Sequence, residues 1–435
     1  MVPIALAALL STFGPAVPNA PEHSVRFDPS PLMKIGVGDA LPAEFDAVGA
    51  RGLRVVRRSE VGEGASHAFH LKLEHPIMPS RHASLLVRDG RVTGAFYPGG
   101  SLRTSLTGIE AGLSGTASED AASDLPCGHR DELIAPAVGN GEGGVAGTPC
   151  SDGTVVDLLV LYTGAAALQA GGVPQMEDWI LWAIEDSNAI YAASGIDLSI
   201  RLVGTAVAAN YFEQAAMVDD LYALTYTDDG LLDEVLPLRD SLHADLVALV
   251  RADGGGACGI AWLAGADPSQ QGYGYSVTAL GCFTNRTFTH ELGHNMGCCH
   301  APGDGGGCTA GGVFPYSVGH RFLGTDGAQY RTVMAYSPGT RIPHFSSPLV
   351  AYAGTPTGIA DSVDNARSIN ITRFAFTQYR CAPCGGDLNG DGTRDGADLA
   401  ILLSGWGTNA PDLDGDGLVG GADLAVLLGA WGACP

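Results

Sequence analysis

The stretch that decides the fold reads Thr289-His290-Glu291-Leu292-Gly293-His294-Asn295-Met296-Gly297-Cys298-Cys299-His300. Histidines four apart lie on one face of a helix, so His290 and His294 can bind the same ion. Gly297 permits a positive-φ turn out of the helix, and this turn brings in His300 as a third ligand. Three imidazoles and one open position are typical of a catalytic zinc rather than a structural one. Glu291 is then close enough to reach a water on that ion.

A second motif lies downstream, where the chain reads Arg331-Thr332-Val333-Met334-Ala335-Tyr336 and continues into a Ser-Pro-Gly loop. It resembles the Met-turn that lies beneath the zinc in metzincin proteases. The resemblance implies that Met334 forms a hydrophobic floor under the histidines and is not a ligand. For Tyr336 two roles stay open. It either acts at the metal, as a fifth ligand or a transition-state hydrogen-bond donor, or it is a packing residue.

The flanking sequence, over residues 155–379, resembles the reprolysin (adamalysin) type of metzincin, especially its bacterial members. The resemblance includes Cys258-Gly259-Ile260-Ala261-Trp262, which looks like the edge strand that lines the substrate cleft. There are two departures. Ala301 follows the third histidine where many reprolysins have Asp, and Tyr336 is reminiscent of astacins and serralysins. The resemblance implies a zinc endopeptidase in which Glu291 activates a water for attack on a peptide carbonyl.

The composition argues against a cytosolic location and against nucleic acid as a partner. The net charge is -24 and the only lysines are Lys34 and Lys72, which argues against nucleic acid or anionic lipid as partners. Ten cysteines are typical of an oxidising compartment. The pairings considered, none of which spacing alone decides, are Cys127 with Cys150, Cys258 with Cys282, Cys298 or Cys299 with Cys308, and Cys381 or Cys384 with Cys434.

Four segments are expected along the chain. Residues 1–20 resemble a secretory signal, and no apolar run reaches the roughly 18 residues that span a bilayer, so we expect an exported protein. Residues 21–150 read as a β-rich propeptide and linker, with a hairpin signal at 84–96; a permanent accessory domain is the alternative. Cys127 lies in Leu-Pro-Cys-Gly-His-Arg-Asp, which faintly resembles the cysteine switch of metzincin propeptides, and a disulfide to Cys150 is the competing use.

Residues 151–380 are expected to fold as the metzincin domain. Strands are predicted at 155–162, 196–202 and 244–250, and helices at 176–193 and 231–242, because apolar runs and period-two alternation take turns with helical patterns. Strand-helix-strand order implies a mixed, mostly parallel sheet that carries helices. The zinc helix is predicted at 284–296, followed by a Gly-rich, irregular segment.

Residues 385–435 hold an internal repeat with an offset of 25, most visible in Asp-Leu-Asn/Asp-Gly-Asp-Gly and in Trp406 with Trp431. Oxygen ligands at loop positions 1, 3, 5 and 12 with Gly at 6 match a calcium-binding EF-hand loop, followed here by a helix. The first site is predicted from Asp387, Asn389, Asp391, Thr393, Asp395 and Asp398. The second is predicted from Asp412, Asp414, Asp416, Leu418 and Asp423. The pair resembles a type I dockerin, which implies a cohesin-like or cell-surface partner.

The sequence therefore predicts a secreted zinc endopeptidase that acts on proteins or peptides, with Zn²⁺ for catalysis and Ca²⁺ in the C-terminal repeats. An exported binding or surface-attachment protein with an inactive metzincin domain is the alternative. The intact Glu291 and the three histidines favour the enzyme.

Overall fold

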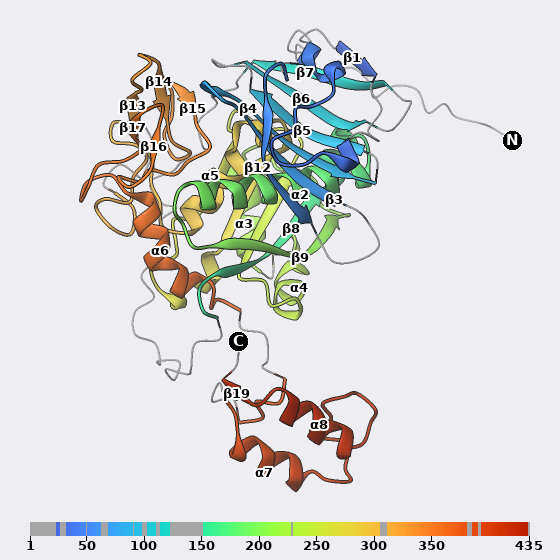
Figure 1. Cartoon of the computed structure of the whole chain (residues 1–435). Helices are drawn as coiled ribbons and strands as arrows, with labels where there is room; N and C mark the ends of the chain where they lie inside the picture. The colour runs from blue at the N-terminus through green and yellow to red at the C-terminus, as the bar shows by residue number, and fades with distance from the viewer. Residues whose placement is uncertain are drawn as a thin grey trace, which may run out of the picture.

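The structure is a computed structural model of the 435-residue chain (Figure 1). It describes residues 23–26, 32–48, 50–61, 68–89, 91–97, 102–109, 114–121, 151–227, 229–304, 311–380, 385–389 and 393–433. The expected signal at 1–20, Cys127, Cys150 and Asp391 lie outside these residues. Within them, no helix is long and apolar enough to cross a membrane.

The N-terminal part is a seven-stranded antiparallel sheet in the order β1-β7-β6-β5-β4-β3-β2. Its elements are β1 (His23–Arg26), η1 (Leu32–Lys34), η2 (Ala43–Val48), β2 (Arg54–Val61), β3 (Ala68–His75), β4 (Met78–Arg88), β5 (Arg91–Tyr97), β6 (Leu102–Ile109) and β7 (Ser114–Ala121). The predicted hairpin is the β4–β5 pair, closed by Arg88 opposite Arg91, with Asp89 at a φ of 49° in its turn.

The central part is built on a five-stranded sheet in the order β11-β12-β10-β8-β9. The strands are β8 (Val155–Thr163), β9 (Ser199–Ala208), β10 (Leu246–Arg251), β11 (Gly259–Ala261) and β12 (Tyr275–Ala279). All neighbours are parallel except β11, which runs antiparallel to β12 at the edge. The helices are α1 (Gly164–Ala170), α2 (Val173–Ala193), α3 (Met217–Thr225), α4 (Val235–Ser241), η3 (Pro268–Tyr273), η4 (Leu280–Asn285) and α5 (Thr287–Asn295).

Alternation along β8 divides the central core into two layers. Leu158 and Val160 point to the face covered by α2 and α5, and Leu159 and Leu161 point to the face covered by α3 and α4. This period of two is what a buried strand imposes on its side chains. The predicted mixed, mostly parallel sheet with helices on its faces is therefore confirmed.

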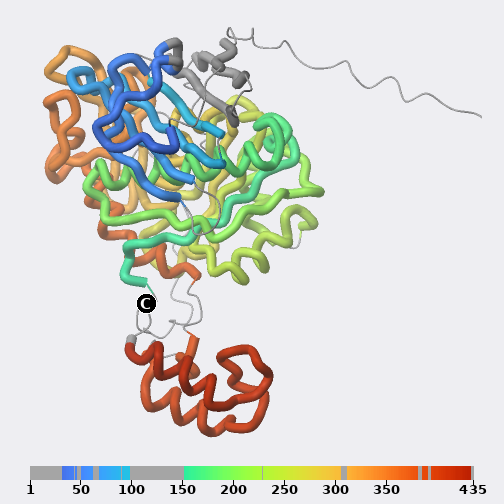
Figure 2. The backbone as a smooth tube through the Cα atoms, turned by 45° about the vertical axis from the view of Figure 1, so that its right-hand side comes forward, coloured from blue at the N-terminus to red at the C-terminus, as the bar shows by residue number. Residues whose placement is uncertain are grey.

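Helix α2 lies between the central sheet and the N-terminal sheet (Figures 1 and 2). Its apolar residues occur all round the helix, which fits a helix covered on both sides. One face of the N-terminal sheet forms its own core with η1 and η2, to which Leu85 belongs. The next residue, Leu86, points the other way and joins the core around α2. The two sheets thus share a continuous apolar layer.

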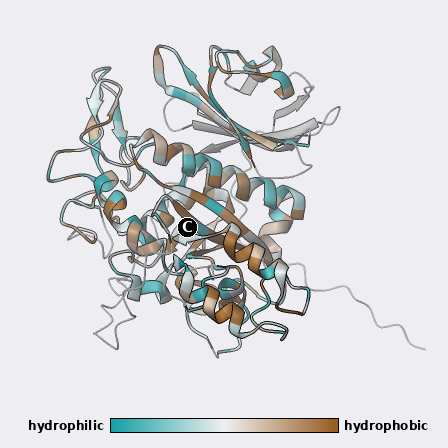
Figure 3. Cartoon of the chain, turned by 60° about the horizontal axis from the view of Figure 1, so that its bottom comes forward, coloured by the Kyte–Doolittle hydropathy of each residue, from teal (hydrophilic) through white to brown (hydrophobic). Residues whose placement is uncertain are grey.

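After α5 the chain is irregular, as expected. Between α5 and α6, the described residues 296–304 and 311–364 form only the short strands β13 (Arg321–Leu323), β14 (Gln329–Arg331), β15 (Thr340–Arg341), β16 (Ala351–Tyr352) and β17 (Thr355–Pro356), and α6 spans Asn365–Phe376. The C-terminal repeat forms β18 (Thr393–Arg394), α7 (Gly396–Ser404), α8 (Gly421–Gly429) and β19 (Gly432–Ala433). In Figures 1 and 2 this repeat lies below the rest of the chain, and Figure 3 shows the hydrophobic residues that recur along α7 and α8.

The predicted zinc helix begins too early. Residues 280–285 form the 3-10 helix η4, and α5 starts only at Thr287. Arg286 separates the two because its φ is 60°, which an α-helix cannot contain. The predicted strand at 196–202 is also shifted, since β9 begins at Ser199, and the predicted helix at 231–242 is shortened to Val235–Ser241.

Candidate metal centre and active site

Helix α5 and the turn after it bring the three histidines together, as predicted from their spacing. His290 and His294 lie one turn apart on the same face of α5, which ends at Asn295. Gly297 then adopts a φ of 92°, and the chain doubles back so that His300 faces the helix. A Cβ on Gly297 would lie 2.6 Å from a methyl of Val313, so space as well as φ favours glycine here. All three histidines are buried.

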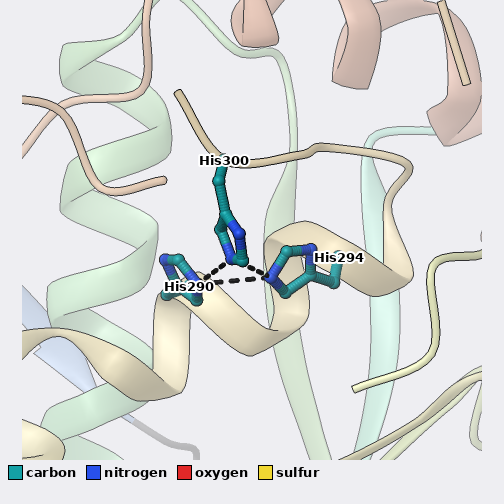
Figure 4. A group of neighbouring side chains, drawn as sticks. All are labelled: His290, His294 and His300. Atoms are coloured by element: carbon teal, nitrogen blue, oxygen red, sulfur yellow. Dashed lines mark hydrogen bonds between the residues drawn. The ribbon is translucent and has the colours of Figure 1, made fainter. Parts of the chain in front are cut away.

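The three Nε2 atoms point at one another (Figure 4). They lie 3.2 Å apart between His290 and His300, 3.2 Å between His290 and His294, and 3.1 Å between His294 and His300. Nitrogens that share a tetrahedral zinc at about 2.0–2.1 Å are separated by about 3.3 Å. The triangle therefore has the size of a zinc site.

Hydrogen bonds on the other side of the rings decide which nitrogen faces the metal. The Nδ1 of His290 lies 2.9 Å from the carbonyl oxygen of Val333, and the Nδ1 of His294 lies 2.8 Å from that of Cys298. A carbonyl can only accept, so each neutral ring carries its proton on Nδ1 and turns a lone pair inward from Nε2. Lone pairs this close repel one another unless a cation lies between them. The donor set thus fits a metal ion.

Glu291 lies beside the histidines, fully buried, next to the edge strand β11. A Cβ added to Gly259 in that strand would lie only 2.3 Å from Oε1 of Glu291. A glycine at this position therefore gives the carboxylate room between α5 and the edge strand. The sequence pattern located both residues but did not indicate that they touch.

Met334 and Tyr336 take the positions expected of a Met-turn. A Cβ on Gly293, between the two helical histidines, would lie 2.6 Å from the sulfur of Met334, so the thioether packs directly under the helix. The ring of Tyr336 lies 4.3 Å from that of His300, measured between centroids. Met334 is fully buried, and Tyr336 is partly buried beside His300. Whether its hydroxyl acts there stays a prediction.

Asp304 contributes to the site in a way that the sequence pattern missed. Its Oδ2 accepts hydrogen bonds from the backbone N–H of Ala301, at 3.1 Å, and of Tyr336, at 2.9 Å. Its Oδ1 is bound by Arg321. Asp304 therefore joins the loop that carries His300 to the Met-turn, although the residue directly after His300 is alanine. The only sequence signal was an acidic residue shortly after the third histidine.

The edge strand is tied to α5 by hydrogen bonds and to η4, the 3-10 helix before α5, by a disulfide. The amide of Asn295 donates from Nδ2 to the carbonyls of Trp262 and Tyr275, both at 3.0 Å. The predicted disulfide between Cys258 and Cys282 is present, with Cα atoms 5.6 Å apart. Of the two cysteines beside His300, Cys299 is disulfide-bonded and Cys298 is a buried thiol. Cys308 lies outside the described residues.

In the C-terminal repeat, both loops are closed in the same way. Asp398 accepts hydrogen bonds from the N–H groups of Leu388, Asn389 and Asp395, at 2.7, 3.2 and 2.8 Å. Asp423 accepts them from Leu413, Asp414 and Gly420, at 2.7, 3.3 and 2.6 Å. These bonds lower the pKa of the Asp423 carboxyl, with the Gly420 N–H as the largest cause.

Only the second predicted calcium site can be followed in full. One carboxylate oxygen each from Asp412, Asp414 and Asp416 lies within 4.8 Å of the others. Leu418 follows them, and its N–H donates to Asp416 at 2.8 Å. The first site is described for Asp387, Asn389, Thr393, Asp395 and Asp398, but not for Asp391.

Comparison with known proteins gives the site a context. A family model described as Metallo-peptidase family M12 (Reprolysin_5) matches residues 152–346. The chain is 28% identical over 302 residues to a peptidyl-Asp metalloendopeptidase of Stenotrophomonas maltophilia, covering 68% of this chain and 70% of the relative. It is 29% identical over 263 residues to a peptidyl-Asp metalloendopeptidase of Pseudomonas aeruginosa, covering 54% and 42%.

Among solved structures, metalloproteinase-II from Bacteroides fragilis is similar with a TM-score of 0.34 and 12% identity, covering 74% of this chain and 86% of that one. The family model and the curated relatives agree on one enzymatic class, and the chain is accordingly a metalloendopeptidase.

Proposed function

We propose that this metalloendopeptidase hydrolyses peptide bonds with a zinc ion held by His290, His294 and His300 and with Glu291 as the general base. The observation that carries the proposal is the triangle of three inward-facing Nε2 atoms 3.1–3.2 Å apart. Its size and its neutral nitrogen ligands suit zinc. Three protein ligands leave a fourth position for a water or a substrate.

The chain's own residues then perform the proton transfers. Zinc in such a site lowers the pKa of a bound water to about 7 and polarises the peptide carbonyl. Glu291 accepts the proton of the attacking water and passes it to the leaving nitrogen. Its burial against Gly259 keeps the carboxylate close to the histidines. Met334 supports the helix from below, and Tyr336 would donate a hydrogen bond to the developing oxyanion, a role that its ring contact with His300 supports.

We extend the specificity in the relatives' name to this chain and propose cleavage next to aspartyl residues of proteins or peptides. We further propose that residues 1–20 direct export and that residues 21–150 act as a propeptide, so the full-length chain is latent until the linker is cut. The N-terminal sheet is bound to η4, directly before the metal helix, where the hydroxyl of Tyr97 donates to the carbonyl of Thr284 at 2.9 Å.

Cys127→Ala separates the two uses proposed for that thiol. Early activation of the full-length chain would identify Cys127 as the blocking ligand. Loss of stability with latency retained would identify a disulfide to Cys150. A full-length chain that digests substrate as fast as the processed enzyme would refute the propeptide altogether.

For the C-terminal repeat we propose two calcium sites and a cohesin-like or cell-surface partner. The convergent carboxylates of Asp412, Asp414 and Asp416 support the second site, because oxygen ligands are what calcium prefers. The identical closure of both loops by Asp398 and Asp423 supports a matching first site. Catalysis need not depend on this part, so its deletion should leave the hydrolysis of small peptides intact.

The central experiment compares Glu291→Gln with the wild type in zinc content and in cleavage of a mixed peptide library. The variant should keep one zinc per chain and lose hydrolysis, because the ligands remain and the base is gone. Glu234→Gln, at an exposed residue before α4, is the matched control and should behave as the wild type. Undiminished cleavage by zinc-loaded Glu291→Gln would overturn the role given to Glu291.

A further inference from the structure

We infer that the N-terminal sheet stays bound to the catalytic part after the linker is cut, so that the processed enzyme consists of two chains without a covalent bond between them. The inference rests on the proposed cleavage of the linker and adds what becomes of the segment that is cut off. The sheet contains no cysteine, because the first cysteine of the chain is Cys127. The sheet's own contacts therefore decide whether it stays.

The apolar contact between the two parts is built like the interior of a domain. On the side of the sheet, Val61, Leu86 and Ala95 belong to one buried cluster with Trp179 and Trp182 of α2. Each of these five side chains is at most 8% exposed. A continuous, fully buried apolar contact is typical of permanent interfaces, whereas transient ones are about as polar as the rest of the surface.

The fit is closest at Trp182, which is 1% exposed. Its Nε1 donates to the carbonyl of Ser84 in β4 at 2.9 Å. A Cβ on Gly94, in the neighbouring strand β5, would lie 3.0 Å from this Nε1 and 2.2 Å from the carbonyl oxygen of Ser84, so a glycine leaves the indole its room. Release of the sheet would return to water a ring of the kind that buries about 150–250 Å² in a core.

Buried polar groups of the catalytic part also have partners in the sheet. The carboxylate of Asp178, 1% exposed, binds Arg88 and Arg91. The side chain of Arg286, 2% exposed, lies 2.9 Å from Nε2 of His82. A buried charged group that loses a partner is destabilised by several times the net gain of an ordinary hydrogen bond. These pairs therefore favour the bound sheet as well.

The sheet is held at three separate places in the catalytic part. Besides its contacts with α2, it binds η4 through the hydroxyl of Tyr97, which donates to the carbonyl of Thr284 at 2.9 Å. The third place follows the Met-turn in sequence, where the hydroxyl of Tyr352 in β16 donates to the carbonyl of Pro79 at 2.6 Å. Cutting the linker removes one covalent connection and leaves all three contacts in place.

The test cuts the full-length chain between the sheet and Cys127. A recognition site for a sequence-specific protease is inserted after Asp124 in the Glu291→Gln variant, so that binding is measured without turnover. No disulfide can then join the two pieces, because the first piece contains no cysteine. Size-exclusion chromatography of the cut protein should elute both pieces together at about 1 µM, as a Kd below micromolar requires. Their separation should need urea.

Three variants show which contacts hold the pieces together, with Kd taken from native mass spectrometry of a dilution series. Leu86→Asp places a charge in the shared apolar cluster and should raise Kd by at least about a hundredfold. Val56→Asp is the matched control and should leave Kd unchanged, because Val56 lies on the same sheet and is 43% exposed. Trp182→Phe is a milder change that keeps a ring in the core. It should raise Kd by about tenfold, because the carbonyl of Ser84 loses its donor.

Pieces that elute separately after the cut would overturn the inference. Equal Kd values for Leu86→Asp, Trp182→Phe and Val56→Asp would do the same, since the shared cluster would then contribute nothing. Failure of the proposed function shows in a different measurement. If cutting the linker of the chain with Glu291 intact leaves peptide hydrolysis unchanged, the proposed latency is refuted, while co-elution of the pieces still supports a bound sheet.

Discussion

Replacing Asp178 with alanine should loosen the N-terminal sheet from the catalytic part. Asp178 lies on α2 with a side chain 1% exposed, and it is bound by Arg91 at 2.9 Å and Arg88 at 3.3 Å from the sheet. Removing one partner of a buried ion pair costs about 3–5 kcal/mol. The two arginine side chains are 16% and 22% exposed and can rehydrate, which lowers the expected loss to about 2–3 kcal/mol.

Urea unfolding of the full chain, followed by tryptophan fluorescence, measures this loss. Trp182 reports on the same interface, because its Nε1 donates to the carbonyl of Ser84 at 2.9 Å. A double-mutant cycle with Arg91→Ala isolates the interaction energy between Asp178 and Arg91. Arg201→Ala is the control, since it breaks an ion pair of good geometry whose arginine is 66% exposed, worth at most about 1 kcal/mol. Equal losses in Asp178→Ala and Arg201→Ala would refute the reasoning.

Four further results are expected. Asp304→Ala should weaken zinc binding by about tenfold to a hundredfold in competition with a chelator, because the loop of His300 loses its tie to the Met-turn. Gly259→Ala should lower kcat but not zinc content, because its Cβ displaces Glu291. Asp412→Ala should remove one binding event in calcium calorimetry, and no calcium uptake near millimolar concentrations by the wild type would contradict both sites. Burial lowers the pKa of His70 to about 4, so folding should lose about 3 kcal/mol as the pH falls from about 6.5 to 4. A plot of the urea unfolding midpoint against pH should be flatter for His70→Gln than for the wild type.

The sign of the last effect follows from where the proton binds. Below pH 6.5 the unfolded chain protonates this imidazole, and the folded chain, where it is buried and lies 2.8 Å from the hydroxyl of Ser84, does so only near pH 4. The unfolded state therefore binds more protons in this window, and stability rises with pH across it. His70 belongs to β3, so the loss of stability at low pH should affect the N-terminal sheet.

The histidine cluster could be predicted because its geometry is local. A spacing of four on a helix and a glycine at the helix end determine where His290, His294 and His300 meet, whatever surrounds them. The start of α5 could not be predicted in the same way. Helical propensity and periodicity continue through residues 284–286, and only the positive φ of Arg286 ends one helix and begins the next.

The sequence pattern could not predict contacts between segments that lie far apart in the sequence. Asp304 reaches the N–H of Tyr336 across 32 residues, and Gly259 meets Glu291 across the sheet edge. Neither residue type is unusual for a loop or an edge strand, so nothing local distinguishes them. The same holds for the N-terminal sheet, whose alternation predicts two faces without indicating that one of them covers α2.

Helix α5 is held at both ends by contacts with segments that lie far away in the sequence. At its start, Arg286 pairs with Asp186 of α2 and with His82 of the N-terminal sheet, at 3.2 and 2.9 Å. At its end, Asn295 binds the edge strand through the carbonyl of Trp262. The ligands lie between these two supports, with His290 one turn after the first and His294 directly before the second. A substitution in the N-terminal sheet that breaks its contact with Arg286 therefore acts one helical turn away from His290. A substitution in the edge strand that breaks its contact with Asn295 acts directly beside His294.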